Sequence, residues 1–174
     1  TADPMKGVNA ILTGMGSLSY GEQAGERMRL GLMLHDPEEE HDCFSDNTHN
    51  SHYYDGLGVR NVYLGAYTRV DGSTVSGPSL SELVAAADAG VDTQLKAELD
   101  ATMTALGAIK TAAEGGFAYD QMLEAGNKDG EALARHYANQ GATLGLAARR
   151  QDLLQQLAAE FASQLHLCRS VAQE

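Results

Sequence analysis

The chain has 174 residues, of which 43% are hydrophobic, and a formal net charge of −12 at pH 7. That length predicts a single domain over residues 1–174 with a buried core of its own. No stretch approaches the run of about 18 apolar residues that a membrane-spanning helix needs. The acidic balance argues against nucleic acid as a partner, because phosphates are bound by basic faces. It is compatible with cation binding, or with solubility alone.

The start of the chain has no initiator Met, no basic segment and no apolar segment of the kind found in signal peptides. We therefore expect that a leader was removed, or that the chain is a piece of a longer protein. The two cysteines, Cys43 and Cys168, are too few for a disulfide framework. They could form one bridge in an oxidising compartment.

The first segment is predicted to be helical to about Leu34. Asp3 before Pro4 is a typical N-cap followed by Pro at the first helical position. Gly14 and Gly16 each weaken a helix by about 1 kcal/mol relative to Ala, so a kink or break is expected there. One face of this helix contains two glycines a turn apart, which would let a neighbouring helix approach closely. That face is formed by Leu18, Gly21, Gly25, Met28 and Leu32.

A second helix is predicted from Pro37 to about Tyr54. Pro has no N–H to donate and so ends or restarts a helix. Asp36 and the three glutamates after Pro37 suit a helix N-terminus, whose dipole favours carboxylates. Gly56 and Gly58 then interrupt the helical pattern.

Residues 65–78 form the clearest loop in the sequence. An Asp71-Gly72 turn between short β-prone flanks is typical of a small hairpin, and Gly77-Pro78 closes the loop.

The next helix begins with a capping box, Ser79-Leu80-Ser81-Glu82, and is predicted to run to about Ala113. Gly115 and Gly116 stop it. Its apolar residues recur every three or four positions, which indicates one buried face. They are Leu80, Val84, Ala87, Val91, Leu95, Leu99, Met103 and Leu106.

A short helix is predicted from Phe117 to Glu124, followed by a last helix that begins near Gly130 and reaches as far as Val171. Four long helices, joined by short turns and one long loop, predict an all-α fold. The architecture we expect is an antiparallel up-down helical bundle.

Four residues are candidate metal ligands. Asp46 and His49, three positions apart, would share one face of the second helix, and Glu22 and Glu26 would lie on one face of the first. If these helices pack side by side, two carboxylates face a carboxylate–histidine pair, an arrangement related to carboxylate metal sites in helical bundles. Oxygen donors with imidazole suit iron, manganese or zinc. The structural alternative is that these polar residues form a buried hydrogen-bond network that fixes helix packing.

Four stretches resemble the imelysin family, which is also classed as peptidase family M75 and includes iron-regulated and insulin-cleaving bacterial proteins. They are residues 21–28 (Gly-Glu-Gln-Ala-Gly-Glu-Arg-Met), 40–49 (Glu-His-Asp-Cys-Phe-Ser-Asp-Asn-Thr-His), 61–65 (Asn-Val-Tyr-Leu-Gly) and 77–80 (Gly-Pro-Ser-Leu). Imelysin proteins consist of two related helical bundles, and these stretches resemble the C-terminal one. The resemblance implies a secreted bacterial protein, periplasmic or associated with the outer membrane, that serves iron or zinc binding or uptake.

The family signature, Gly-x-His-x-x-Glu, is absent from this sequence, so its metal ligands are not carried over. The resemblance implies a partner, the N-terminal half of the same protein, present as a separate chain after cleavage and able to carry a membrane anchor. It leaves two alternative functions open, a metallopeptidase whose signature lies on that other half and a non-catalytic interaction module. No His-Glu-x-x-His motif is present in this chain. The secreted location favours a structural disulfide between Cys43 and Cys168.

Overall fold

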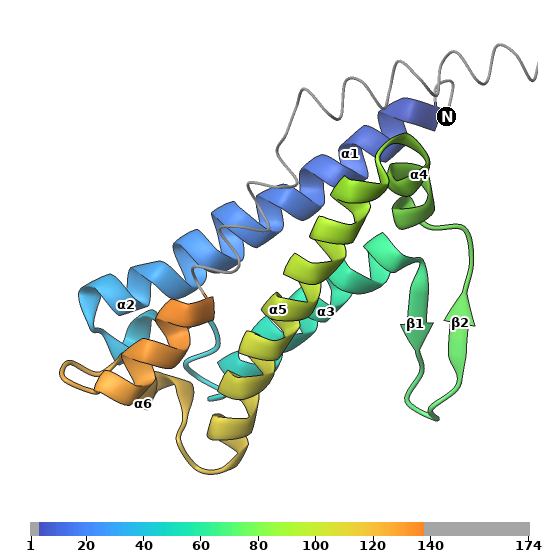
Figure 1. The fold of residues 1–174 in the computed structure, drawn as a ribbon. Helices are drawn as coiled ribbons and strands as arrows, with labels where there is room; N and C mark the ends of the chain where they lie inside the picture. Colours follow the sequence, from blue (N-terminus) through green and yellow to red (C-terminus); the bar gives the residue numbers. More distant parts are fainter. Residues whose placement is uncertain (1–3, 138–174) are drawn as a thin grey trace, which may run out of the picture.

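The computed structural model describes residues 4–137, and nearly all of their secondary structure is helical (Figure 1). A small antiparallel hairpin interrupts the helices, so the predicted all-α fold with a hairpin in the 65–78 loop is confirmed. No helix in the described part of the chain is both long enough and apolar enough to cross a bilayer. The elements are α1 (Pro4–Gly16), a π-helical segment η1 (Ser17–Arg29), α2 (Leu30–Leu34), a 3₁₀ turn η2 (Pro37–Glu39), α3 (Thr48–Leu64), β1 (Ala66–Thr68), β2 (Thr74–Ser76), α4 (Leu80–Ala87), α5 (Ala89–Glu114) and α6 (Tyr119–Leu123).

The first helix runs without a break through α1, η1 and α2 (Figure 1). The break predicted at Gly14 and Gly16 is therefore wrong, because the helix changes from α to π hydrogen bonding after Gly16 and keeps its course. A π-helix bonds residue i to i+5, so side chains four or five apart share a face. The buried residues of η1 follow that spacing, and they are Ser19, Gln23, Ala24 and Met28.

The close helix contact predicted at Gly21 and Gly25 is not made by any helix in the described part of the chain. A Cβ built at Gly21 meets no described atom within 4 Å, and one at Gly25 meets only the Tyr20 carbonyl of its own helix. The prediction assumed α-helical spacing, which this segment does not have. α2 ends at His35, whose φ of 52° places it in the left-handed region.

The second helix begins at Thr48, eleven residues later than the predicted start at Pro37. Pro37–Glu39 forms a single 3₁₀ turn, in which the Asp36 carboxylate accepts a hydrogen bond from the Glu38 N–H at 3.0 Å. Acidic residues after a proline therefore cap a turn here, and a loop follows it. α3 continues through the two glycines that were expected to interrupt it, and ends at Gly65 with φ 61°.

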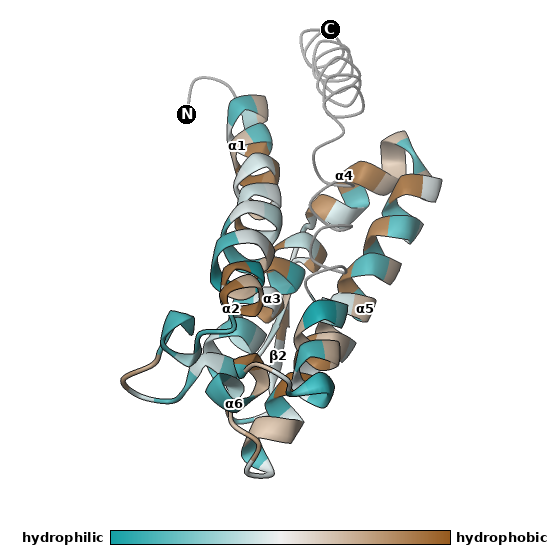
Figure 2. Ribbon diagram, turned by 90° about the vertical axis from the view of Figure 1, so that its left-hand side faces the viewer, coloured by the Kyte–Doolittle hydropathy of each residue, from teal (hydrophilic) through white to brown (hydrophobic). Residues whose placement is uncertain are grey.

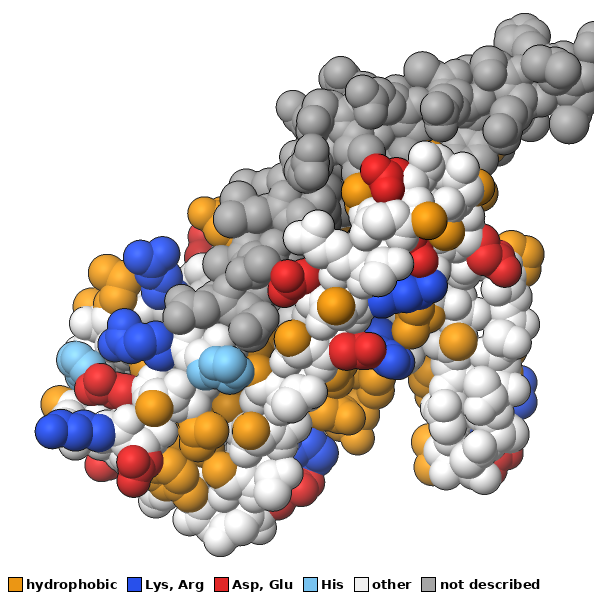
Figure 3. Space-filling model, in the orientation of Figure 1, with side chains coloured by type: hydrophobic (Ala, Val, Ile, Leu, Met, Phe, Trp, Pro, Cys, Tyr) orange, Lys and Arg blue, Asp and Glu red, His pale blue; other side chains and the backbone are white. Residues whose placement is uncertain are grey.

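The hairpin between α3 and α4 pairs β1 with β2 in antiparallel register, with Tyr67 opposite Val75. Its turn includes Gly72 at φ 82°, a conformation that favours glycine. All three residues of β2 are exposed, and the hairpin projects from the helical body (Figure 3).

The capping box at Ser79 is confirmed, since its hydroxyl accepts from the Glu82 N–H and its own N–H donates to the Glu82 carboxylate, both at 3.0 Å. The long helix predicted after it is divided at Asp88 into α4 and α5. Asp88 accepts from the N–H groups of Gly90 and Val91, so its carboxylate caps the second helix. The predicted stop at Gly115 is confirmed.

The end of the described chain is again helical, over residues 128–137. Gly130 packs so closely on α6 that a Cβ at this position would overlap the backbone of Met122. Residues 138–174 lie outside the described part of the chain, with most of the predicted last helix and Cys168.

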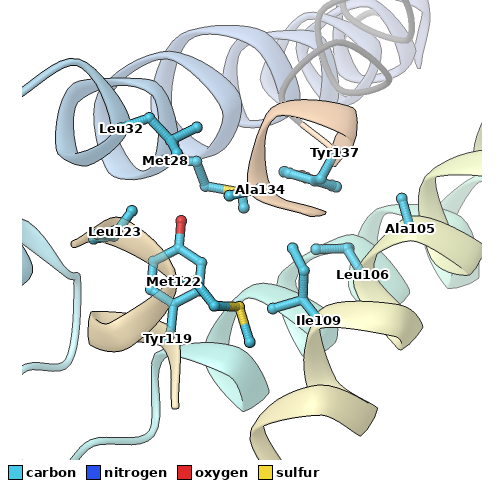
Figure 4. Close-up of a cluster of buried hydrophobic side chains, with 10 residues drawn as sticks. All are labelled: Met28, Leu32, Ala105, Leu106, Ile109, Tyr119, Met122, Leu123, Ala134 and Tyr137. Atoms are coloured by element: carbon cyan, nitrogen blue, oxygen red, sulfur yellow. The ribbon is translucent and has the colours of Figure 1, made fainter. Parts of the chain in front are cut away.

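Two clusters of buried side chains hold the helices together. α3 contacts both the first helix and α5, and Figure 2 shows it between them. One cluster joins α3, α4 and α5 through Val59, Tyr63, Val84, Leu95 and Leu99. The other joins the first helix, α5, α6 and residues 128–137 (Figure 4), through Met28, Leu32, Ala105, Leu106, Ile109, Tyr119, Met122, Leu123, Ala134 and Tyr137.

Candidate functional site

The four predicted metal ligands lie on three different segments. Glu22 and Glu26 are exposed on η1, and Asp46 is exposed in the loop before α3. His49 is half-buried in the first turn of α3, and its Nε2 lies 3.1 Å from the amide nitrogen of Asn50. The prediction that Asp46 and His49 share a helical face is wrong, because Asp46 precedes the helix and has a φ of 50°.

A metal site from these residues finds no support in the geometry. Within residues 4–137, no three His, Cys, Asp or Glu side chains are grouped as ligands for one ion. Metal binding by Glu22, Glu26, Asp46 and His49 therefore stays a prediction. The disulfide also stays a prediction, because Cys43 is exposed in the loop while Cys168 lies outside the described residues.

The structure instead folds the polar run at residues 40–49 onto the start of α3. Thr48 Oγ1 accepts a hydrogen bond from the Asp42 N–H at 2.9 Å, and the Ser51 hydroxyl donates to the Asp42 carboxylate. The first helix is joined to α3 through Gln23, whose amide donates to the backbone carbonyl of His52 at 2.6 Å. The π-helical segment thus fixes the position of the polar end of α3.

The first residue of this run, Glu40, belongs to a cluster of three buried polar side chains. The other two are His52 of α3 and Tyr119 of α6. Glu40 is 6% exposed, and the other two are fully buried. The rings of His52 and Tyr119 meet edge to face, with centroids 5.4 Å apart. One carboxylate oxygen of Glu40, both ring nitrogens of His52 and the Tyr119 hydroxyl have no hydrogen-bond partner among the described residues. Buried polar atoms are nearly always paired, so this cluster has unmet hydrogen-bonding capacity.

The burial of this cluster favours the uncharged form of each group. Burial lowers the pKa of His52 to about 3, with the nearby His41 and Arg27 acting in the same direction. Burial also raises the pKa of Glu40, although a hydrogen bond with Thr48 opposes this. The pKa of Tyr119 is raised, mainly by burial. At neutral pH the imidazole of His52 is therefore neutral.

An open pocket lies beside this cluster, between η1 and α3, with a volume of about 600 Å³. His41 joins the two, because it lines the pocket and its ring stacks on His52 with centroids 6.2 Å apart. The pocket is lined almost entirely by polar side chains. They are Arg27, His41, Asn47, Asn50, Ser51, Tyr54 and Asp55.

Contacts among the lining residues hold the pocket in shape. Arg27 Nη1 donates to Asp55 Oδ2 at 2.8 Å, which ties η1 to α3. The Asn50 amide donates to Asn47 Oδ1 at 2.8 Å and accepts from Lys110 Nζ of α5 at 2.6 Å.

The sequence contained a signal for this pocket that the metal-ligand reading did not use. Five of the lining residues follow one another at i, i+3, i+4, i+7 and i+8, which places them on one face of α3. The predicted helix from Pro37 to Tyr54 already contained four of these positions, but only carboxylate and imidazole side chains were considered as ligands. The five residues are Asn47, Asn50, Ser51, Tyr54 and Asp55.

Comparison with known proteins gives one family match. A sequence model described as Imelysin matches residues 1–148 of the chain. Comparison with curated proteins finds no match.

Proposed function

Because the chain belongs to the imelysin family, we propose that it is the C-terminal helical half of a secreted bacterial protein that serves iron or other metal acquisition. Its place would be the periplasm or the outer membrane. The observation that carries the proposal is the position of the run at residues 40–49, in which His41 and Asn47 line the polar pocket. The stretch that resembles the family most closely therefore contributes side chains to a solvent-accessible pocket as well as to the buried interior.

The described half supplies no metal ligand cluster of its own, so the proposal assigns the main ligands to the N-terminal half, with its Gly-x-His-x-x-Glu signature. Carboxylates of the described residues would then lie next to that metal site and strengthen metal binding. Glu22, Glu26 and Asp46 remain exposed and free to face a second bundle. The net charge of −12 also favours the approach of cations.

Exposed apolar side chains support a second bundle as partner. Met33 is 68% exposed and Leu34 is 55% exposed at the end of α2, and Phe44 is fully exposed in the following loop. Large exposed apolar side chains are typical of surfaces that another protein covers. We therefore propose that the N-terminal half packs against this region of the chain.

The test is a titration with iron and with zinc, on the chain alone and on the chain co-purified with the polypeptide that carries Gly-x-His-x-x-Glu. The proposal predicts stoichiometric binding by the pair, and weaker binding in the Asp46→Ala and Glu22→Gln variants of this chain. Equal metal binding by the variants removes these residues from the site. If the pair binds no metal, the function proposed here is wrong.

A further inference from the structure

The pocket between η1 and α3 has the size and lining of a site for a small hydrophilic molecule. Its volume of about 600 Å³ lies within the range of small-molecule sites, roughly 300–1,000 Å³. Most such sites are lined by apolar side chains, whereas this one presents a guanidinium, an imidazole, two amides, two hydroxyls and a carboxylate. The ligand that suits it is therefore polar over most of its surface.

Hydrogen-bond donors in this pocket are available for a ligand. Arg27 contacts Asp55 through Nη1, and the guanidinium carries five N–H donors in a planar fork. Asn47 uses its carbonyl oxygen to accept from Asn50, while its amide nitrogen has no partner among the described residues. The hydroxyl of Tyr54 also makes no hydrogen bond there, and the side chain is 59% exposed. These donors call for acceptor oxygens on the ligand.

Polar groups without hydrogen-bond partners also lie close to one lining residue, although they do not line the pocket themselves. His41 lines the pocket and stacks on His52, whose two ring nitrogens are buried without a partner among residues 4–137. Nδ1 of His49 is buried and unpartnered as well. Such groups are rare in folded proteins, and water or a ligand usually satisfies them.

We propose that this pocket binds a small organic carboxylate, in which Arg27 holds the carboxylate group and Asp55 fixes the orientation of the guanidinium. A planar guanidinium matches a carboxylate in a bidentate arrangement. The remaining oxygen of Asp55 and the Ser51 hydroxyl can accept from a hydroxyl group of the ligand. The class that fits best is a hydroxycarboxylate.

The charges in the pocket favour binding of a carboxylate group over binding of a phosphate group. The pocket contains one guanidinium, and an aspartate lies 2.8 Å from it. A phosphate dianion places both negative charges on the one group that would meet Arg27 and Asp55, whereas a dicarboxylate such as malate carries its two charges on separate carboxylates. Phosphate would therefore meet stronger repulsion from Asp55, with no second permanent cation among the lining residues to offset it. The protein is also strongly acidic, so non-specific anion binding elsewhere on its surface is disfavoured.

The experiment is calorimetric titration of the full chain, free of metal, with malate, succinate and inorganic phosphate. We expect saturable binding of malate, weaker binding of succinate because it lacks the hydroxyl, and weakest binding of phosphate. Arg27→Gln should weaken malate binding by at least about tenfold. Arg60→Gln is the matched control, because Arg60 forms a similar ion pair with Asp100 outside the pocket.

Tyr54→Phe provides a second variant, since it removes one hydroxyl from an exposed side chain and leaves the ion pair intact. It should weaken malate binding about three- to tenfold while the melting temperature stays the same. The proposal is overturned if malate does not bind at concentrations up to about 10 mM. It is equally overturned if Arg27→Gln binds malate as tightly as the unchanged chain, or if phosphate binds more tightly than malate. Because no metal is added, the result is independent of the metal role proposed above.

Discussion

At the scale of single residues, the buried carboxylate of Asp92 accepts hydrogen bonds from three side chains. Asp92 is 5% exposed and accepts from the Tyr63 hydroxyl at 2.9 Å, the Ser81 hydroxyl at 2.7 Å and Lys96 Nζ at 2.7 Å. Burial alone would raise the pKa of Asp92, but these hydrogen bonds outweigh it and hold the pKa below its usual value. The charged form is therefore stable inside the protein.

Asp92→Asn should lower the free energy of unfolding by about 2–3 kcal/mol. The amide oxygen can still accept from Tyr63 and Ser81, but these hydrogen bonds lose their charged acceptor, and an amide NH₂ replaces the oxygen that accepts from Lys96. Urea denaturation at pH 7 measures this change. Asp100→Asn is the control, since its ion pair with Arg60 is largely exposed and should change stability by less than about 1 kcal/mol. Equal losses in the two variants would contradict the importance of burial.

The neutral state of His52 predicts a loss of stability in mild acid. The pKa of His52 falls from 6.5 to about 3 in the folded protein. Between these values the unfolded chain binds a proton that the folded chain does not, so stability falls as the pH falls. From pH 7 to pH 5 the contribution of His52 is about 2 kcal/mol. Glu40 acts in the opposite sense, since burial raises its pKa and the folded chain then binds a proton more readily than the unfolded chain does.

His52→Gln should therefore reduce the pH dependence of the free energy of unfolding by about 2 kcal/mol over this range, whatever its effect at pH 7. Thr102→Val is the control, because it changes a buried polar side chain that has no ionisable group and so should leave the slope unchanged. A slope that survives in His52→Gln would show that another group titrates.

The residues of the predicted site show what a sequence pattern could and could not establish. The segment that contains Asp46 and His49 was identified as polar and unusual, and it does border the pocket. Their spacing of three residues was read as helical, but Asp46 adopts a left-handed conformation before the helix starts. Aspartate tolerates that conformation, so the residue type gave no sign of the change.

At the scale of elements, α3 lies against α5 at a glycine. A Cβ at Gly56 would overlap Leu106 Cδ1 and lie 3.4 Å from Met103 Sδ. Gly58, two positions later in the same helix, has no described atom within 4 Å of its Cβ position. A side chain at Gly56 would therefore force buried Leu106 to shift, while Gly58 has open space around it.

Gly56→Ala should destabilise the protein by about 1–2 kcal/mol, because the cost of overpacking exceeds the gain in helix propensity. Gly58→Ala should stabilise it by up to about 1 kcal/mol, since only the propensity changes. Thermal denaturation of the two variants measures both. Stabilisation by Gly56→Ala would mean that the two helices are not packed as described.

Element boundaries were predicted well where a local interaction fixes them. The capping box at Ser79 and the hairpin near Gly72 depend on neighbouring residues alone, and both predictions are confirmed. The start of α3 was misplaced because Asp36 and Pro37 begin a 3₁₀ turn as readily as a helix. Local signals therefore leave the start of α3 open, and the loop before it is held by the hydrogen bond from the Asp42 N–H to Thr48 Oγ1.

At the scale of the whole molecule, apolar side chains remain uncovered in the described part of the chain. Phe44 is fully exposed in the loop before α3, and Val70 is fully exposed near the hairpin turn. Neither contributes to a core cluster, so neither should affect folding.

Phe44→Ser should weaken association with the proposed N-terminal half by at least about tenfold, because exposed aromatic side chains often dominate binding energy. The stability of the chain should change by less than about 0.5 kcal/mol. Val70→Ser is the control, an equally exposed residue on a different part of the surface. Surface plasmon resonance with the partner half measures the difference. Equal affinities of the two variants would place the interface elsewhere.

The helical class of the molecule was predictable because its stripes of apolar residues recur at regular intervals. The set of residues that the first helix buries was not predictable in the same way. The prediction assumed α-helical spacing throughout, whereas the middle of this helix is π-helical. Met28 and Leu32 do reach the core, as predicted, but Gln23 and Ala24 are buried in place of the two glycines.

The π-helical segment Ser17–Arg29 makes the number of residues in the first helix as important as their identity. A π-helix closes each hydrogen bond over one more residue than an α-helix does. Unless the segment returned to α-helical bonding, removing one residue would rotate everything on one side of the deletion relative to the other. Gln23 and Arg27 would then turn away from α3, or Met28 would leave the core. Insertions and deletions are tolerated in many surface loops, but in this segment a change of one residue would separate the pocket from the fold that supports it. A homologous sequence with a gap in this segment is therefore expected to lack the pocket, even if every lining residue is retained.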